Sequence, residues 1–154
     1  MSRPRPIGYR ILLVTGFLLL ALLLLGQTMA VIDYDFTVSI GLQESEHVMG
    51  EMGVAANRGF GIGDTAVYVP LLALGLYGLL KRKPWGVLTM AGAMAITAYW
   101  PVTCMFILIY ARNISDFHFT NYTAYAILLT LITVYGLWGL WYLYSRRHVL
   151  IQGE

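Results

Sequence analysis

The chain has 154 residues and a net charge of +2, with 58% of its residues hydrophobic and only 12% charged. This composition excludes an ordinary water-soluble domain, in which about 25% of residues are charged, and a disordered chain, which requires low hydrophobicity. The single cysteine excludes a fold held together by disulfides. The class that remains is a small integral membrane protein.

Four segments of the chain are long and apolar enough to form transmembrane helices. A helix needs about 20 mostly apolar residues to cross the roughly 30 Å hydrocarbon core of a bilayer. Short connections make consecutive helices antiparallel neighbours. We therefore expect an all-α, up-down four-helix bundle that forms a single membrane domain over residues 1–154. The predicted helices cover approximately residues 11–32, 62–80, 85–110 and 122–144, with a long outer loop over residues 33–61.

The first segment could also be read as a cleaved signal peptide. It is preceded by Arg3, Arg5 and Arg10, and Thr28-Met29-Ala30 resembles a signal-peptidase site. Its apolar stretch over residues 11–32 is longer than the core of a signal peptide, which spans about 7–15 residues. The length favours a retained helix.

The distribution of charge predicts how the bundle sits in the membrane. Basic residues cluster before the first helix, between the second and third helices and after the fourth, and all three places face the same side. Most acidic residues fall on the other side. Because Lys and Arg concentrate in cytoplasmic loops, we expect both termini in the cytoplasm, and the inner membrane if the source is bacterial. Orientation and contact with anionic lipid explain these bases, so no nucleic-acid partner is expected.

The outer loop contains a candidate metal site. Residues 43–56 are predicted to form a short extra helix that carries Glu44, His47 and Glu51 on one face. Glu44-x-x-His47 is half of the motif found in carboxylate-bridged metal sites of helical bundles. A complete site would need further ligands, and the plausible supplements are Asp116 and His118 in the other outer loop, with Asp33, Asp35 and Asp64. A solvated polar face explains the same residues and is favoured, so no firm metal or cofactor is predicted.

A glycine-rich stretch, Asn57–Thr65, precedes the predicted second helix and contains Asp64. It lacks the flanking strand of a phosphate-binding loop, which excludes nucleotide binding. Seventeen residues separate Asp64 from Lys81, or about 25 Å of helix, so the carboxyl is expected at or just inside the outer membrane boundary. One hypothesis is a helix N-cap paired with Arg58 or Arg112. The other is a ligand-binding or proton-handling role.

Two classes of function remain open, and the first is binding. The bundle and its outer loop would hold a hydrophobic or lipid-like molecule, or a membrane-protein partner. The scarcity of charge within the predicted helices favours this class, because ion transporters carry more polar residues at mid-depth. The candidate ligand-binding residues are Asp64, Arg58, Asn57, Trp100 and Tyr135.

The second class is a membrane enzyme that performs acid–base or metal-assisted chemistry on a lipid or isoprenoid at the outer face. Such chemistry requires a positioned acid or base that can reach the substrate. The candidate catalytic residues are Glu51, Asp64 and Glu44.

Overall fold

The computed structural model describes residues 6–111, 113 and 119–152, and this part of the chain forms helices and no strand. The four predicted apolar helices are confirmed, and each is long and apolar enough to cross a membrane. Many large apolar side chains on them are exposed, which suits contact with lipid. The spans are Ile7–Ile32, Glu46–Leu80, Pro84–Ala111 and Tyr122–His148.

The first span contains a change of helix type. It runs as α1 (Ile7–Leu23), continues as the π-helical turn η1 (Leu24–Thr28) and ends as α2 (Met29–Ile32). Asp33 then adopts an extended conformation and caps the short helix α3 (Tyr34–Ser39) by accepting a hydrogen bond from a backbone N–H. A π-helical turn shifts the backbone hydrogen bonds by one residue and is frequent at functional sites.

The second span begins much earlier than the sequence predicted. It consists of α4 (Glu46–Gly63), the π-helical turn η2 (Asp64–Tyr68) and α5 (Val69–Leu80), which follow one another directly. The expected start near residue 62 is therefore wrong, and the expected loop helix over residues 43–56 is largely the first part of this span. Gly50, with a φ of 70°, puts a kink inside α4. Beyond this kink the glycines continue the helix, because backbone groups in an apolar environment must be hydrogen-bonded within the helix.

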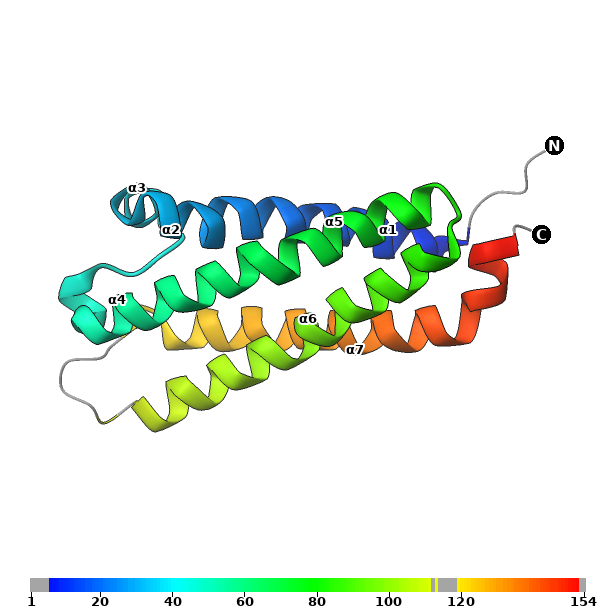
Figure 1. Ribbon diagram of the computed structural model, residues 1–154. Helices are drawn as coiled ribbons and strands as arrows, with labels where there is room; N and C mark the ends of the chain where they lie inside the picture. The colour runs from blue at the N-terminus through cyan, green and yellow to red at the C-terminus, as the bar shows by residue number, and fades with distance from the viewer. Residues whose placement is uncertain (1–5, 112, 114–118, 153–154) are drawn as a thin grey trace.

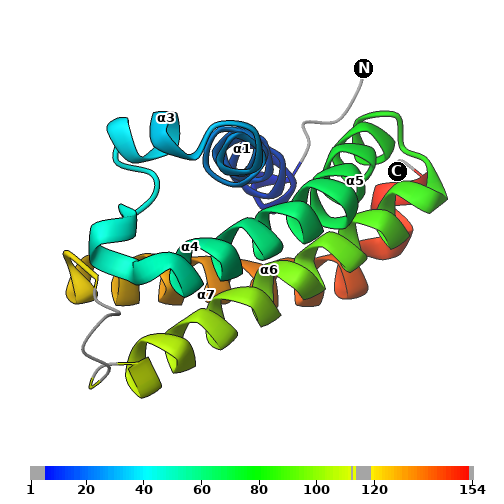
Figure 2. The ribbon, with the colours of Figure 1, turned by 60° about the vertical axis from the view of Figure 1, so that its left-hand side comes forward.

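The last two helices, α6 (Pro84–Ala111) and α7 (Tyr122–Gln152), pack along each other. Figure 1 shows the successive long helices side by side and running in alternating directions. In Figures 1 and 2 the α4–α5 stretch lies beside α1 on one side and α6 on the other. We call the end with the α5–α6 turn the turn end, and the end with α3 the loop end.

The densest packing lies towards the turn end. Gly78 and Gly86 bring the backbones of α5 and α6 into direct contact, since a Cβ added to Gly78 would lie 2.4 Å from the Cα of Gly86. Small residues permit this close approach between apolar helices. Fully buried side chains from α1, α5, α6 and α7 fill the surrounding core, among them Leu12, Leu72, Leu76, Met90, Met94 and Leu143.

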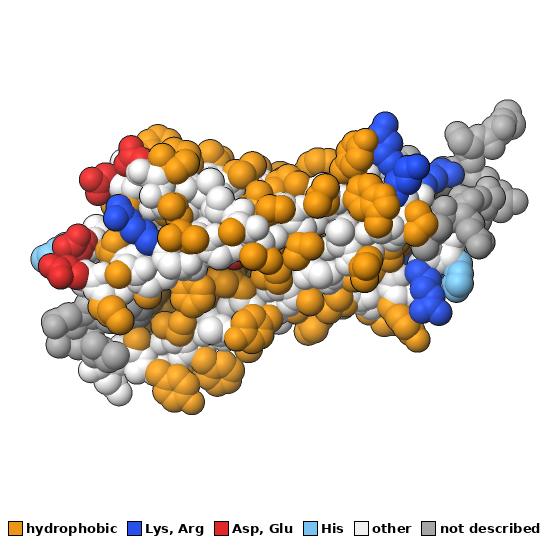
Figure 3. All heavy atoms as spheres, in the orientation of Figure 1, with side chains coloured by type: hydrophobic (Ala, Val, Ile, Leu, Met, Phe, Trp, Pro, Cys, Tyr) orange, Lys and Arg blue, Asp and Glu red, His pale blue; other side chains and the backbone are white. Residues whose placement is uncertain are grey.

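Charge separates along the long axis of the molecule. Figure 3 shows acidic side chains gathered at the loop end and most basic side chains at the turn end, with hydrophobic side chains between them. The basic residues at the turn end include Lys81, Arg82 and Lys83 in the α5–α6 turn, and Arg146 and Arg147 near the end of α7. The face shown in Figure 3 is thus charged at its two ends and apolar around its middle.

Candidate functional site

A cavity of about 380 Å³ lies in the loop-end half of the molecule and is open to its surface. Its walls come from α1, α4, α6 and α7, together with both π-helical turns and the segment after α3. The volume is within the range of small-molecule sites, about 300–1,000 Å³. Most of the wall is apolar, including Leu22, Leu23, Phe60, Ile107, Leu128 and Ile132.

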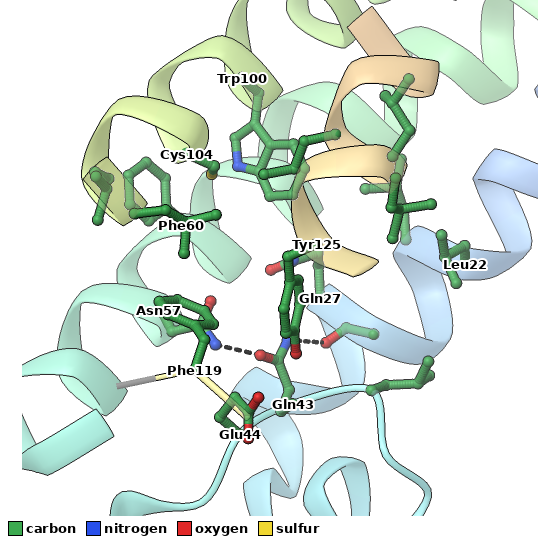
Figure 4. A pocket seen from close by; sticks show the side chains of 18 of the residues that line it. Leu22, Gln27, Gln43, Glu44, Asn57, Phe60, Trp100, Cys104, Phe119 and Tyr125 are labelled. Atoms are coloured by element: carbon green, nitrogen blue, oxygen red, sulfur yellow. Dashed lines mark hydrogen bonds between the residues drawn. The ribbon is translucent and has the colours of Figure 1, made fainter. Parts of the chain in front are cut away.

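One end of the cavity is polar because three distant segments meet there. The side-chain amide of Gln43 donates a hydrogen bond of 2.8 Å to the backbone carbonyl of Gly26 in η1. The Asn57 amide in turn donates to the side-chain oxygen of Gln43. Figure 4 shows both bonds at the edge of the cavity. These two hydrogen bonds, which join Gly26, Gln43 and Asn57, therefore link the first span, the connecting segment and α4.

Tyr34 and Arg58 lie beside this polar end. The Tyr34 hydroxyl donates to the Glu44 carbonyl at 2.9 Å and accepts from Asn57 at 3.4 Å. Burial raises the pKa of Tyr34, so its phenol stays protonated near neutral pH. The guanidinium of Arg58 lies 5.5 Å from the centre of the Tyr34 ring, in a cation–π arrangement. Arg58 therefore stacks on an aromatic ring rather than pairing with Asp64.

The Glu44 carboxylate connects the segment after α3 to the start of α7. It accepts hydrogen bonds from the backbone N–H of Thr120 at 2.9 Å and from the Thr120 hydroxyl at 2.7 Å. Glu44 is the only one of the three catalytic candidates that lines the cavity. His47 and Glu51 are exposed on α4, and Asp116 and His118 lie outside the described residues. Within the described ranges, no three His, Cys, Asp or Glu side chains are grouped so that they could hold a metal ion.

Asp64 is buried in η2, with 6% of its surface exposed. Its Oδ2 atom has no hydrogen-bond partner among the described residues. The predicted N-cap role is wrong, because the helix runs continuously through this position. Asp64 does not line the cavity, but Tyr68, one turn further along, does. The Tyr68 hydroxyl is held 2.5 Å from that of Thr97.

Two polar side chains line the apolar part of the cavity without partners in the described structure. The side-chain oxygen of Gln27 and the indole N–H of Trp100 are both buried and unpaired. Gln27 comes from η1 and Trp100 from α6, and Figure 4 shows both reaching into the space between the helices. Buried polar groups normally have hydrogen-bond partners. These two atoms have almost no accessible surface, so the two residues line the cavity with their other atoms.

Two of the five predicted ligand-binding residues, Asn57 and Trp100, line the cavity, and Asp64, Arg58 and Tyr135 do not. The Tyr135 hydroxyl instead donates to the backbone carbonyl of Leu12 at 2.8 Å. Sequence reasoning did not single out Gln27 and Gln43. The available signal was the polar side chain of Gln27 within an otherwise apolar segment.

The chain matches no protein-family model, no curated protein and no solved structure. Any proposal about function therefore rests on the cavity and the polar groups around it.

Proposed function

We propose that this chain is a multi-pass membrane protein that binds a hydrophobic, lipid-like molecule in the loop-end cavity. The observation that carries this proposal is the cavity itself, which has a predominantly apolar wall built by four helices and one polar end. An amphipathic molecule matches such a site, because its chain removes apolar surface from water and its head contacts the polar groups. The surrounding bilayer supplies molecules of this kind.

The proposed orientation has four spans in alternating directions and both termini in the cytoplasm. It is supported by the basic residues of the turn end, among them Lys81, Arg82 and Lys83, since cytoplasmic loops carry the excess of Lys and Arg. The cavity would then lie in the outer half of the membrane. Molecules from the outer leaflet would reach it without crossing the bilayer.

Binding fits the cavity better than catalysis. Glu44 is the only carboxylate among the described lining residues, and both its oxygens accept hydrogen bonds from Thr120. A general acid or base must be free to reach the proton that it transfers. The described part of the site does not bring Glu51 or Asp64 into the lining.

The proposal is tested by filling the cavity. Ala124 lines it, whereas Ala126, two positions further along α7, does not, and both residues are exposed. In Ala124→Phe, the added ring is expected to abolish the rise in Tm that single-chain lipids cause in purified, detergent-solubilised protein. In the matched control, Ala126→Phe, that rise is expected to persist. Equal ligand responses in both variants, or no response in the unmodified protein, would contradict the proposed function.

A further inference from the structure

The exposed part of the cavity lining is apolar. None of the exposed side chains in the described lining is polar, and all of them lie within the four spans. They are Leu22, Ala56, Phe60, Ile107, Ala124 and Leu128. Figure 4 shows two of them, Phe60 and Leu22, on opposite sides of the cavity. An apolar rim is unfavourable against water and suits hydrocarbon, so the cavity opens sideways towards lipid chains.

The polar groups of the lining lie away from this rim. Gln43, Glu44 and Asn57 are half-buried at the loop end, and each is hydrogen-bonded within the protein. The cavity thus has a polar end at the loop end and apolar walls along the spans. An amphipathic molecule inside it has its head at the loop end.

The cavity has a closed floor near the middle of the spans. Leu19 and Trp100 line it, but Gly16 and Thr97, about one helical turn nearer the turn end, are buried in the packed part of the molecule. A Cβ added to Gly16 would lie 2.8 Å from the side chain of Leu76. The cavity therefore does not continue into the turn-end half.

The size of the cavity suits one acyl chain. Its lining on α7 runs from Ala124 to Ile132, or about 12 Å of helix. One leaflet contributes about 15 Å to the hydrocarbon core of a bilayer. The volume of about 380 Å³ holds roughly a dozen methylene-sized groups at about 30 Å³ each, the share of one water molecule in the liquid. A second chain does not fit.

We propose that the cavity takes up one acyl chain of a two-chain membrane lipid from the side, while the second chain stays in the bilayer. This inference rests on the proposed function and specifies its ligand. The polar end and the floor of the cavity follow each other in the same direction as the head and chain end of a lipid in the leaflet at the loop end. A lipid of that leaflet enters without turning over, and the closed floor keeps it there.

Photolabelling in a bilayer tests this proposal. The purified full chain is placed in nanodiscs of phosphatidylcholine that contain a trace of phosphatidylcholine with a diazirine at the end of one acyl chain, and adducts are mapped by mass spectrometry. We expect adducts on Leu19 and Leu129, which line the cavity with only 9% and 5% of their surface exposed. Leu72 and Leu76, buried outside the lining, are expected to stay unlabelled. A diazirine next to the ester is expected to move the adducts towards Asn57 at the polar end.

Two substitutions separate uptake into the cavity from contact with the outer surface. Ala124→Phe places a ring in the cavity and is expected to abolish the adducts on Leu129. Labelling of Leu131, which is 62% exposed and outside the lining, is expected to persist. In the matched control, Ala126→Phe, both leucines are expected to be labelled. If Ala124→Phe does not fold, the comparison of the two diazirine positions in the unmodified protein decides the question.

The outcomes distinguish this inference from the proposed function. Adducts on exposed residues such as Leu131 alone would overturn uptake from the side, while the proposed function stands if single-chain lipids still raise the Tm in detergent. Adducts on Leu72 or Leu76 would contradict the closed floor. If the cavity gains no adducts and single-chain lipids do not change the Tm, the proposed function itself fails.

Discussion

The hydroxyls of Thr28 and Thr65 lie 2.9 Å apart and join the two π-helical turns of the described chain. Thr28 ends η1 in the first span, and Thr65 lies in η2 of the second. Both turns also contribute to the cavity, through Gln27 and Tyr68 respectively. The two irregular stretches of helix are thus fixed to each other beside the candidate site.

The first prediction concerns this contact between hydroxyls. Thr28→Val and Thr65→Val are each expected to destabilise the protein, and the double variant less than the sum, because the second substitution removes a bond already lost. The coupling expected from interhelical hydrogen bonds in membranes is about 0.6 kcal/mol. It is measured from the free energies of unfolding in mixed detergent micelles. Thr133→Val is the control, as its hydroxyl bonds to its own helix at the Leu129 carbonyl. Strict additivity between Thr28 and Thr65 would contradict the contact.

The second prediction concerns the backbone contact at the turn end. Gly78→Ala would place a Cβ 2.4 Å from the Cα of Gly86, so α5 and α6 must separate. We expect a loss of about 1–3 kcal/mol in the free energy of unfolding, as for other overpacked sites. Gly92→Ala is the matched control, because its Cβ would meet only Leu71 at 3.7 Å. Equal effects of the two substitutions on stability would rule out the close approach.

The third prediction concerns the buried carboxyl of Asp64. Its Oδ2 atom has no partner in the described structure, and burial of an uncompensated charge costs free energy. Asp64→Asn keeps the shape and removes the charge, so we expect it to raise the free energy of unfolding by about 1 kcal/mol at neutral pH. Asp35→Asn, at an exposed position in α3, is expected to have little effect. A clear loss of stability in Asp64→Asn would show that the carboxylate has a stabilising partner.

The fourth prediction concerns the orientation in the membrane. In a Cys104→Ala background, Ser39→Cys at the loop end is expected to react with a membrane-impermeant maleimide added to intact cells. Lys83→Cys at the turn end is expected to react only after the cells are opened. Both positions are exposed, so access from each side decides the labelling. The reverse pattern would invert the proposed orientation, and equal labelling of both in intact cells would exclude it.

The four apolar helices could be predicted from the sequence because length and composition determine them locally. The start of the second span could not. Its glycines resemble helix breakers in the sequence, whereas in the structure the helix continues through Gly59, Gly61 and Gly63, and Gly61 allows contact between helices. At Gly61, an added Cβ would lie 2.8 Å from the backbone oxygen of Gln27. That contact joins residues far apart in the chain, and no local pattern reveals it.

The candidate site could be predicted only in part, because it too depends on contacts between residues far apart in the chain. Asn57 and Trp100 were singled out and line the cavity, but the role of Gln43 depends on meeting Gly26, 17 residues away. The sequence predicts Glu44 as half of a metal-binding motif. In the structure its carboxylate bonds to Thr120, 76 residues further along the chain. Polar residues in this chain take their roles from tertiary neighbours, which spacing alone does not show.

The touching backbones of Gly78 and Gly86 give the two halves of the molecule different mechanical properties. The side chains around them are closely packed, and a second backbone contact, where a Cβ on Gly136 would lie 2.6 Å from the Ala98 nitrogen, fixes the middle of α6 to α7. The part of α6 that lines the cavity, from Trp100 to Leu108, lies beyond both contacts. A ligand of the proposed kind would therefore meet a wall that can yield at the far end of α6 while the core at the turn end stays packed.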